Sequence, residues 1–410
     1  MNKIGKILLI LACSGFLYSQ LFPQDGTLYA GTDDNPFKEK LYPQGKKFPF
    51  GIWTIHTLHA MKQVKKDGFN FIQCYSPGEG TEEEIKQWLE WAKDTELFVM
   101  FNMGGFRKQA VFNEDGRHMK SFARRLETYK NYEHIAWWNL PEEKKINDGY
   151  EGPMIKAYCK YLHENDPLKR PVYMYPAAGH VAESIVPYVT YLDIIGGGIY
   201  TSLYKKARPW VLWVIQQEVK AIKESGVSNR MKVPIAFLQL SPGDGIPPTF
   251  TEIYYDIYAS IIAGAKGVVA YYLHHSREVL GAYDAYAKAA KELAGEAPLG
   301  SAVLFGKNYP GISIKILSGP EIVTFLVNRN REEFQCPSIN FSAKEHDGRF
   351  WLIAVNSSNE KVAAEFRGFP GRSETLKVSF EKREITLKNG SFREDFEPLA
   401  VHIYYKEGLK

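Results

Sequence analysis

Two adjacent carboxylates, Glu142 and Glu143, follow an apolar run that begins at Trp137. A carboxylic acid beside tryptophan rings keeps its proton to higher pH, which suits it to act as a general acid near neutrality. The alternative is a solvated loop or helix start, because Lys144 and Lys145 follow the pair and charge runs are usually solvated.

Aromatic and amide side chains recur at the ends of the other apolar runs. Sugars present apolar C–H faces and hydroxyl groups, so rings and amides in one place predict a carbohydrate site. The alternative for any one ring is packing inside the fold, although buried Tyr and Trp side chains then need polar partners. The predicted binding residues are Trp53, Gln73, Tyr75, Asn102, Trp138, Tyr175, Tyr200, Gln239, Tyr271 and His274.

Eight short apolar runs alternate with amphipathic helical stretches between residues 48 and 296, which predicts a (β/α)8 TIM barrel. In such a barrel, active residues come from the carboxyl ends of the strands and the loops that follow. A doubly wound sheet is the alternative, but no glycine-rich turn follows the first run. The predicted strands are Phe50–Ile55, Phe69–Tyr75, Leu97–Met103, His134–Asn139, Val172–Tyr175, Ile194–Tyr200, Ile235–Leu240 and Gly267–Tyr272.

The pattern of the sequence changes after the predicted barrel. Residues 297–311 are rich in Gly and Pro and predict a linker. Short alternating runs then fill residues 312–410, with hairpin signals at Asp347-Gly348 and Asn389-Gly390. We expect a small all-β sandwich domain here.

The first 19 residues have the layout of an export signal, and residues 20–47 form a further N-terminal segment. Lys3 and Lys6 precede the apolar stretch Ile7–Ala12, after which small residues follow. We expect a secreted protein, or one in the periplasm or on the outer surface. Cys13 is a candidate for lipidation, which would be the only link to a membrane.

Composition excludes several classes of partner and site. The formal charge is +4 over 410 residues, and basic and acidic residues are interleaved, so we expect no nucleic-acid partner. Cys74, Cys159 and Cys336 show no metal spacing and are expected to be buried free thiols. No metal box surrounds His274-His275, which leaves hydrogen bonding to sugar, orientation of the acid, or packing. We expect neither a metal nor a cofactor.

Several short segments resemble (β/α)8-barrel glycoside hydrolases of the large retaining-glycosidase superfamily. Trp137–Glu143 is similar to their strand-four motif, and Pro234–Gln239 resembles a subset in which Gln ends strand seven. Phe350–Asn356 and Phe396–Tyr404 are similar to the β-sandwich domain appended to that subset. The resemblance implies that Glu142 is the general acid that protonates the leaving oxygen of a glycosidic bond.

One position departs from the superfamily pattern. Retaining members carry a nucleophilic Glu at the end of strand seven, where this chain has Gln239. Three accounts remain open: a second carboxylate from another strand end, a substrate group or water in its place, or binding without cleavage. The candidate second carboxylates are Glu79, Asp193, Asp244 and Glu252.

The sequence therefore predicts an extracytoplasmic glycoside hydrolase acting on an oligo- or polysaccharide. The alternative is a non-catalytic glycan-binding or cell-envelope protein on the same barrel. An isomerase or lyase is a third interpretation, but it would need a phosphate or metal site, and the sequence shows neither.

Overall fold

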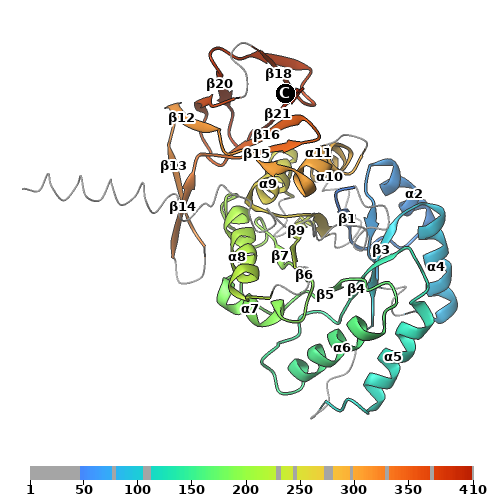
Figure 1. The fold of residues 1–410 in the computed structure, drawn as a ribbon. Helices are drawn as coiled ribbons and strands as arrows, with labels where there is room; N and C mark the ends of the chain where they lie inside the picture. The colour runs from blue at the N-terminus through green and yellow to red at the C-terminus, as the bar shows by residue number, and fades with distance from the viewer. Residues whose placement is uncertain are drawn as a thin grey trace, which may run out of the picture.

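The computed structural model describes residues 47–75, 80–104, 112–227, 232–242, 247–271, 280–295, 299–327, 332–369 and 374–408 (Figure 1). The N-terminal segment with its predicted signal and Cys13 lies outside these residues. No helix in the described ranges is long and apolar enough to cross a membrane.

Parallel strands form the barrel, in the spatial order β5-β4-β3-β2-β1-β10-β9-β7. The first and last predicted strands pair with each other, because β1 and β10 are hydrogen-bonded in register from Phe50 and Val268. Between β5 and β6 the barrel closes through the Asp193 amide, which donates to the Val172 carbonyl at 2.9 Å. The strands are β1 (Phe50–Ile52), β2 (Phe71–Ile72), β3 (Phe98–Asn102), β4 (Ile135–Asn139), β5 (Val172–Tyr173), β6 (Ile194–Ile195), β7 (Gly198–Ile199), β8 (Val233–Pro234), β9 (Ala236–Gln239) and β10 (Val268–Tyr271).

Helices surround the strands, and three of them, α2, α4 and α9, begin with a threonine side-chain cap. Thr81 and Glu84 form a capping box at the start of α4, where Glu82 and Glu83 also complement the helix dipole. The helices are α2 (Leu58–Lys66), α4 (Glu82–Asp94), α5 (Arg117–Tyr129), α6 (Glu151–Asn165), α7 (Ala182–Val189), α8 (Trp210–Glu224), α9 (Phe250–Ala263) and α10 (Leu280–Leu293). The predicted (β/α)8 barrel is confirmed.

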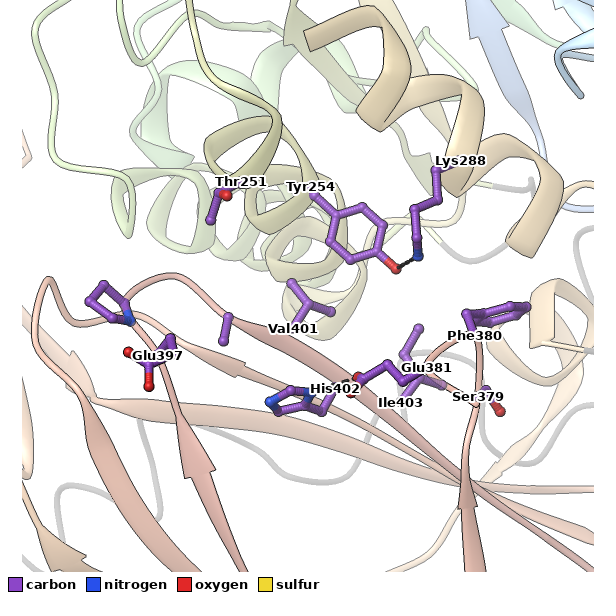
Figure 2. Close-up of a pocket in the computed structure, with 12 residues that line it drawn as sticks. Thr251, Tyr254, Lys288, Ser379, Phe380, Glu381, Glu397, Val401, His402 and Ile403 are labelled. Carbon is purple, nitrogen blue, oxygen red and sulfur yellow. Dashed lines mark hydrogen bonds and ion pairs between the residues drawn. The ribbon is translucent and has the colours of Figure 1, made fainter. Parts of the chain in front are cut away.

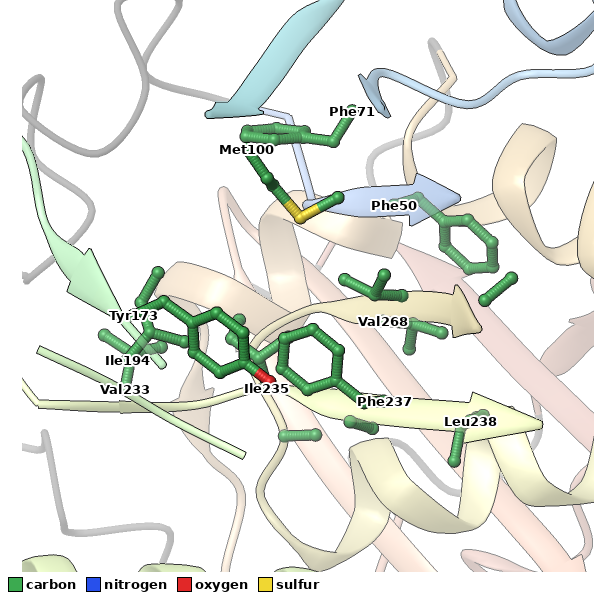
Figure 3. Packing of buried hydrophobic residues seen from close by; sticks show 14 of the residues in the cluster. Phe50, Phe71, Met100, Tyr173, Ile194, Val233, Ile235, Phe237, Leu238 and Val268 are labelled. Atoms are coloured by element: carbon green, nitrogen blue, oxygen red, sulfur yellow. The ribbon is translucent and has the colours of Figure 1, made fainter. Parts of the chain in front are cut away.

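Large side chains fill the inside of the barrel (Figure 3). The Tyr173 ring stacks on Phe237 with centroids 4.5 Å apart, and Phe71 lies 4.8 Å from Trp137. Each of these pairs joins strands that are not neighbours, so the rings meet across the interior. Met100 pairs in register with Trp137 and adds to the same layer. This layer closes the barrel below the carboxyl ends of its strands.

The sixth barrel strand is not continuous, contrary to the single strand predicted over Ile194–Tyr200. It divides into β6 and β7 at Gly196 and Gly197. A Cβ atom on Gly196 would lie 2.4 Å from the Ile235 carbonyl oxygen, so only glycine fits there. The Gly197 amide leaves the sheet and donates to the Glu218 carboxyl at 3.1 Å. Close packing, rather than a phosphate cradle, explains these glycines.

The C-terminal part is an antiparallel β-sandwich, as predicted. A six-stranded sheet and a three-stranded sheet share a core that includes Phe366, Phe392 and Tyr404. Asp347-Gly348 and Asn389-Gly390 have positive φ angles and form the predicted turns. The strands are β11 (Lys307–Asn308), β12 (Ser313–Ser318), β13 (Ile322–Leu326), β14 (Glu333–Pro337), β15 (Ile339–His346), β16 (Arg349–Asn356), β17 (Val362–Arg367), β18 (Thr375–Val378), β19 (Arg383–Thr386), β20 (Ser391–Phe396) and β21 (Val401–Glu407).

The two parts pack tightly against each other. The segment predicted as a linker contains helix α11 (Leu299–Phe305), whose Val303 carbonyl accepts a hydrogen bond from half-buried Lys266 at 2.7 Å. The β13–β14 hairpin lies beside α8, and the indole of Trp210 donates to the Val327 carbonyl at 3.0 Å (Figure 1). The predicted linker is therefore partly helical and packs against the barrel. Cys74, Cys159 and Cys336 are buried, and none of the three forms a disulfide, as expected.

Candidate active site

Glu142 lies just beyond the carboxyl end of β4, and its carboxyl group is held on one side only. The Tyr75 hydroxyl, from the end of β2, donates to Glu142 Oε2 at 2.6 Å. Oε1 is buried and has no hydrogen-bond partner among the described residues. Burial raises the pKa of Glu142 to about 7, and the hydrogen bond from Tyr75 opposes that rise. The carboxyl group can therefore carry a proton near neutral pH and present one oxygen to a ligand.

Three amide side chains lie at the carboxyl ends of β2, β3 and β4, the same end of the barrel as Glu142. Strand alternation places Gln73, Asn102 and Asn139 on the same face as the interior side chains two residues before them, which are Phe71, Met100 and Trp137. Both polar atoms of the Gln73 amide and both of Asn139 are buried without a partner among the described residues. The Asn102 Oδ1 atom accepts from the Gly104 amide at 2.9 Å. Buried amides are costly to leave unbonded, so these side chains are suited to hydroxyl groups of a ligand or to water.

Aromatic rings form the other side of the cluster. The Trp53 ring stacks on Tyr75 with centroids 5.9 Å apart and meets Tyr271 edge-on at 5.2 Å. Tyr271 in turn stacks on Tyr200 at 5.2 Å, and the Tyr200 hydroxyl hydrogen-bonds with that of Tyr175. The indole nitrogen of Trp53 has no partner among the described residues. The structure thus brings together five of the predicted rings from five strand ends.

Gln239 at the end of β9 is tied to the backbone. Its Oε1 atom accepts from the Leu203 amide at 3.1 Å, and its Nε2 atom donates to the Ser241 carbonyl at 2.7 Å. The side chain is 1% exposed. It therefore anchors the loop after β7 to the end of β9, and it is a neutral group where a carboxylate was expected.

Trp138 lies outside the cluster. Its neighbours in the strand, Trp137 and Asn139, face the barrel interior, so Trp138 faces the helices. Its indole donates to Asp166 at 2.9 Å, and the Arg170 guanidinium lies 4.3 Å from its ring centre. The role in ligand binding predicted for Trp138 is wrong, since its ring and its donor are both occupied by the protein.

Two of the four candidate second carboxylates have other tasks. Asp193 precedes β6, at the amino end of that strand, and accepts from the Val172 amide at 3.0 Å while contacting His163 at 2.8 Å. Glu252 caps α9 with Thr249 and pairs with Arg208 at 3.0 Å. Neither carboxylate serves as a partner for Glu142.

The remaining predicted residues divide between exposed and undescribed positions. Glu143 is exposed, has a positive φ of 56°, and bonds through its backbone to the Tyr175 carbonyl at 2.8 Å. Because its side chain is exposed whereas that of Glu142 is half-buried, Glu143 is a suitable control for Glu142. Glu79, Asp244 and His274 lie outside the described residues.

Sequence reasoning missed Asn139 and Tyr204. The signal for Asn139 was its position two residues after Trp137, because strand alternation places both side chains on the interior face of β4. Tyr204 follows the sixth barrel strand, and its ring lies 5.8 Å from Tyr200. It was missed because the turn that returns it to Tyr200 has no distinctive motif.

A separate hollow of about 400 Å³ lies between the barrel and the sandwich (Figure 2). Its charged groups already have protein partners. Lys288 donates to the Tyr254 hydroxyl at 2.6 Å, and His402 contacts Glu381 at 2.6 Å. The hollow lacks the unbonded polar atoms of the Glu142 cluster, so we place the candidate active site at the strand ends. No group of three or more metal-binding side chains occurs in the described part of the chain.

Comparison with known proteins supports the class of fold. No family model matches the sequence, and no curated protein matches it. Among solved structures, the chain is similar to an α-amylase from Geobacillus thermoleovorans in complex with acarbose (TM-score 0.57, 11% identity, 87% of this chain and 98% of that one). It is also similar to an Anoxybacillus α-amylase (TM-score 0.58, 10% identity, 88% and 98%).

A glycoside hydrolase of family 5 from Bacteroides vulgatus is a further match (TM-score 0.50, 13% identity, 87% of this chain and 88% of that one). The chain therefore has the (β/α)8 fold of glycoside hydrolases, as the sequence resemblance predicted. At these identities the likeness concerns the fold, and the activity must be argued from the site.

Proposed function

We propose that this protein is an extracytoplasmic glycoside hydrolase acting on an oligo- or polysaccharide, with Glu142 as the general acid. The observation that carries the proposal is the Glu142 carboxyl group. One of its oxygens is held by Tyr75 at 2.6 Å, the other has no partner among the described residues, and burial raises its pKa to about 7. The export-like layout of the first 19 residues supports the location.

The chemistry follows from these positions. A protonated Glu142 donates its proton to the glycosidic oxygen as the bond to the sugar breaks, so the leaving group departs as a neutral alcohol. The Gln73 and Asn139 amides bond sugar hydroxyls, which places the scissile oxygen beside the acid. Tyr271, which is partly exposed, offers apolar ring surface to the C–H faces, and the buried Trp53 ring packs against it. Acarbose in one of the similar structures makes α-glucan chains an obvious first class of ligand to test.

Gln239 favours a second candidate function, glycan binding without cleavage. A neutral amide bonded to Leu203 and Ser241 cannot act as a glycosyl nucleophile. Asp193 and Glu252 are committed elsewhere. If no water-activating carboxylate completes the site, the same cluster would bind sugar chains and leave them intact.

A panel of oligosaccharides separates the two functions. The panel comprises malto-, cello- and xylo-oligosaccharides of two to six units, and products are measured as new reducing ends. We expect turnover by the wild type and by Glu143→Gln, and at least about 100-fold less by Glu142→Gln, since general-acid catalysis contributes about that much or more. Full activity of Glu142→Gln would remove the central claim. Saturable binding without products would establish the second function.

A further inference from the structure

Tyr204 is a large aromatic side chain held at the surface. Its relative exposure is 45%, and it lies in the turn that follows β7. Its neighbour Leu203 is 40% exposed. Single exposed apolar side chains are normal on proteins, so the position of Tyr204 beside the candidate active site is what gives it meaning.

The Tyr204 ring continues the ring cluster of the candidate active site. Its centroid lies 5.8 Å from Tyr200, which lies 5.2 Å from Tyr271, which lies 5.2 Å from Trp53. Trp53 is 0% exposed and Tyr200 is 8% exposed, Tyr271 between them is partly exposed, and Tyr204 at the end of the series reaches 45%. The rings thus form one path from the surroundings of Glu142 to the outside.

The turn that carries Tyr204 is anchored at several points. The Gln239 amide bonds the backbone of Leu203 at 3.1 Å, and the Tyr204 amide donates to the Tyr200 carbonyl at 2.8 Å. The Lys206 ammonium donates to the Val327 carbonyl of the sandwich domain at 3.2 Å.

Arg208 fixes the first residues of the turn. It donates to the Thr201 hydroxyl at 2.7 Å and to the Ser202 hydroxyl at 2.6 Å. The Asp256 carboxylate, at 2.8 Å, holds Arg208 in place. A binding surface that is rigid before the ligand arrives loses little entropy on binding.

We propose that Tyr204 and Tyr200 form an additional sugar-binding platform, held in place by Gln239, so that the ligand is a carbohydrate chain rather than a single sugar. This inference rests on the proposed carbohydrate function.

A carbohydrate chain suits this surface better than a protein partner does. Two exposed side chains cover far less than the roughly 800 Å² per partner of a stable protein interface. The surface is also continuous with the rings near Glu142, so a chain bound there can reach the acid. Gln239, at the end of β9, then has a role of its own in place of a nucleophilic Glu, because it positions the platform.

Chain-length dependence of binding tests the platform. Affinities for malto-, cello- and xylo-oligosaccharides of two to six units are measured by calorimetry in the Glu142→Gln background, in which hydrolysis is blocked. We expect affinity to rise with length, and Tyr204→Ala to reduce binding of the best hexasaccharide about tenfold while changing disaccharide binding less than about twofold. Tyr204→Trp should restore hexasaccharide binding because it keeps a ring at that position.

The controls separate this inference from the proposed function. Leu168→Ala removes a side chain of similar exposure, 43%, between α6 and β5, and should leave every affinity unchanged. Gln239→Ala should weaken hexasaccharide binding more than disaccharide binding. Equal losses for short and long chains in Tyr204→Ala, or no binding of any panel member, would overturn the platform. If the wild type hydrolyses no panel member but binding still strengthens with chain length, the proposed hydrolase activity is contradicted and the platform is not.

Discussion

Replacing Glu142 by Gln should stabilise the folded protein above pH 7 while it removes the proposed acid. Burial raises the pKa of Glu142 from 4.5 in the unfolded chain to about 7 in the folded protein. Below pH 4.5 both states carry the proton, so this group adds no pH dependence. Between pH 4.5 and 7 only the folded state retains the proton, so the wild type loses stability as the pH rises. Gln is neutral throughout and avoids that loss.

The size of the effect follows from the same values. A carboxyl pKa of about 7 in place of 4.5 corresponds to about 3 kcal/mol of unfolding free energy at full burial. Glu142 keeps some contact with solvent, which screens the charge, so we expect about 1–2 kcal/mol in favour of Glu142→Gln at pH 8. At pH 4 the two proteins should differ little, because an amide and a protonated acid are similar in shape and both accept from Tyr75.

Urea unfolding followed by tryptophan fluorescence at pH 4, 6 and 8 measures this difference. The midpoint of Glu142→Gln should exceed that of the wild type at pH 8 and match it at pH 4. Glu143→Gln removes the neighbouring exposed carboxylate and should follow the wild type closely at each pH. A midpoint difference for Glu142→Gln that is the same at pH 4 and pH 8 would refute the reasoning, because it would mean that Glu142 is not destabilised by its charge.

Three further changes test the site and the joint between the two parts. Tyr75→Phe removes a hydrogen bond that lowers the pKa of Glu142, so the basic limb of kcat/KM against pH should move to higher pH. Burial lowers the pKa of Lys266 to about 7, so this group makes wild-type stability rise between pH 7 and 10.5, where only the unfolded chain carries its proton. Lys266→Met should reduce that rise in thermal unfolding, and the remainder comes from Lys344, whose pKa burial lowers to about 8. Gly198→Ala would place a Cβ atom 2.5 Å from the Tyr175 hydroxyl oxygen and should cost about 1–3 kcal/mol in urea unfolding.

For each of these three substitutions, one result would contradict the expectation. An unchanged pH profile for Tyr75→Phe would show that Tyr75 does not act on the ionising acid. Parallel stability profiles for the wild type and Lys266→Met would show that Lys266 stays charged in the folded protein. Gly149→Ala adds a methyl group with no atom within 4 Å and is the control for Gly198→Ala. Equal stability of the two alanine variants would contradict the crowding at Gly198.

The barrel itself could be predicted because its signals are local. Apolar runs alternating with amphipathic helices need only the periodicity of the chain, and the two hairpin turns need only Asp-Gly and Asn-Gly. The position of Glu142 at a strand end followed from the same alternation of apolar runs and helices, because Glu142 comes directly after the fourth run. The break in the sixth strand was not predicted, because it depends on the Ile235 carbonyl that lies against Gly196 from a neighbouring strand.

The sequence by itself determined the fold, the position of the acid at the end of the fourth strand, and the absence of a carboxylate at residue 239. Only the tertiary structure decided which side chains meet Glu142. In that structure Trp138 contacts Arg170, and Asp193 lies at the amino end of the barrel strands, away from Glu142. The Gln239 side chain bonds two backbone groups. The physical reason is that periodicity follows from neighbours along one chain, whereas a site is made by side chains from several strands whose facing and register are set by packing.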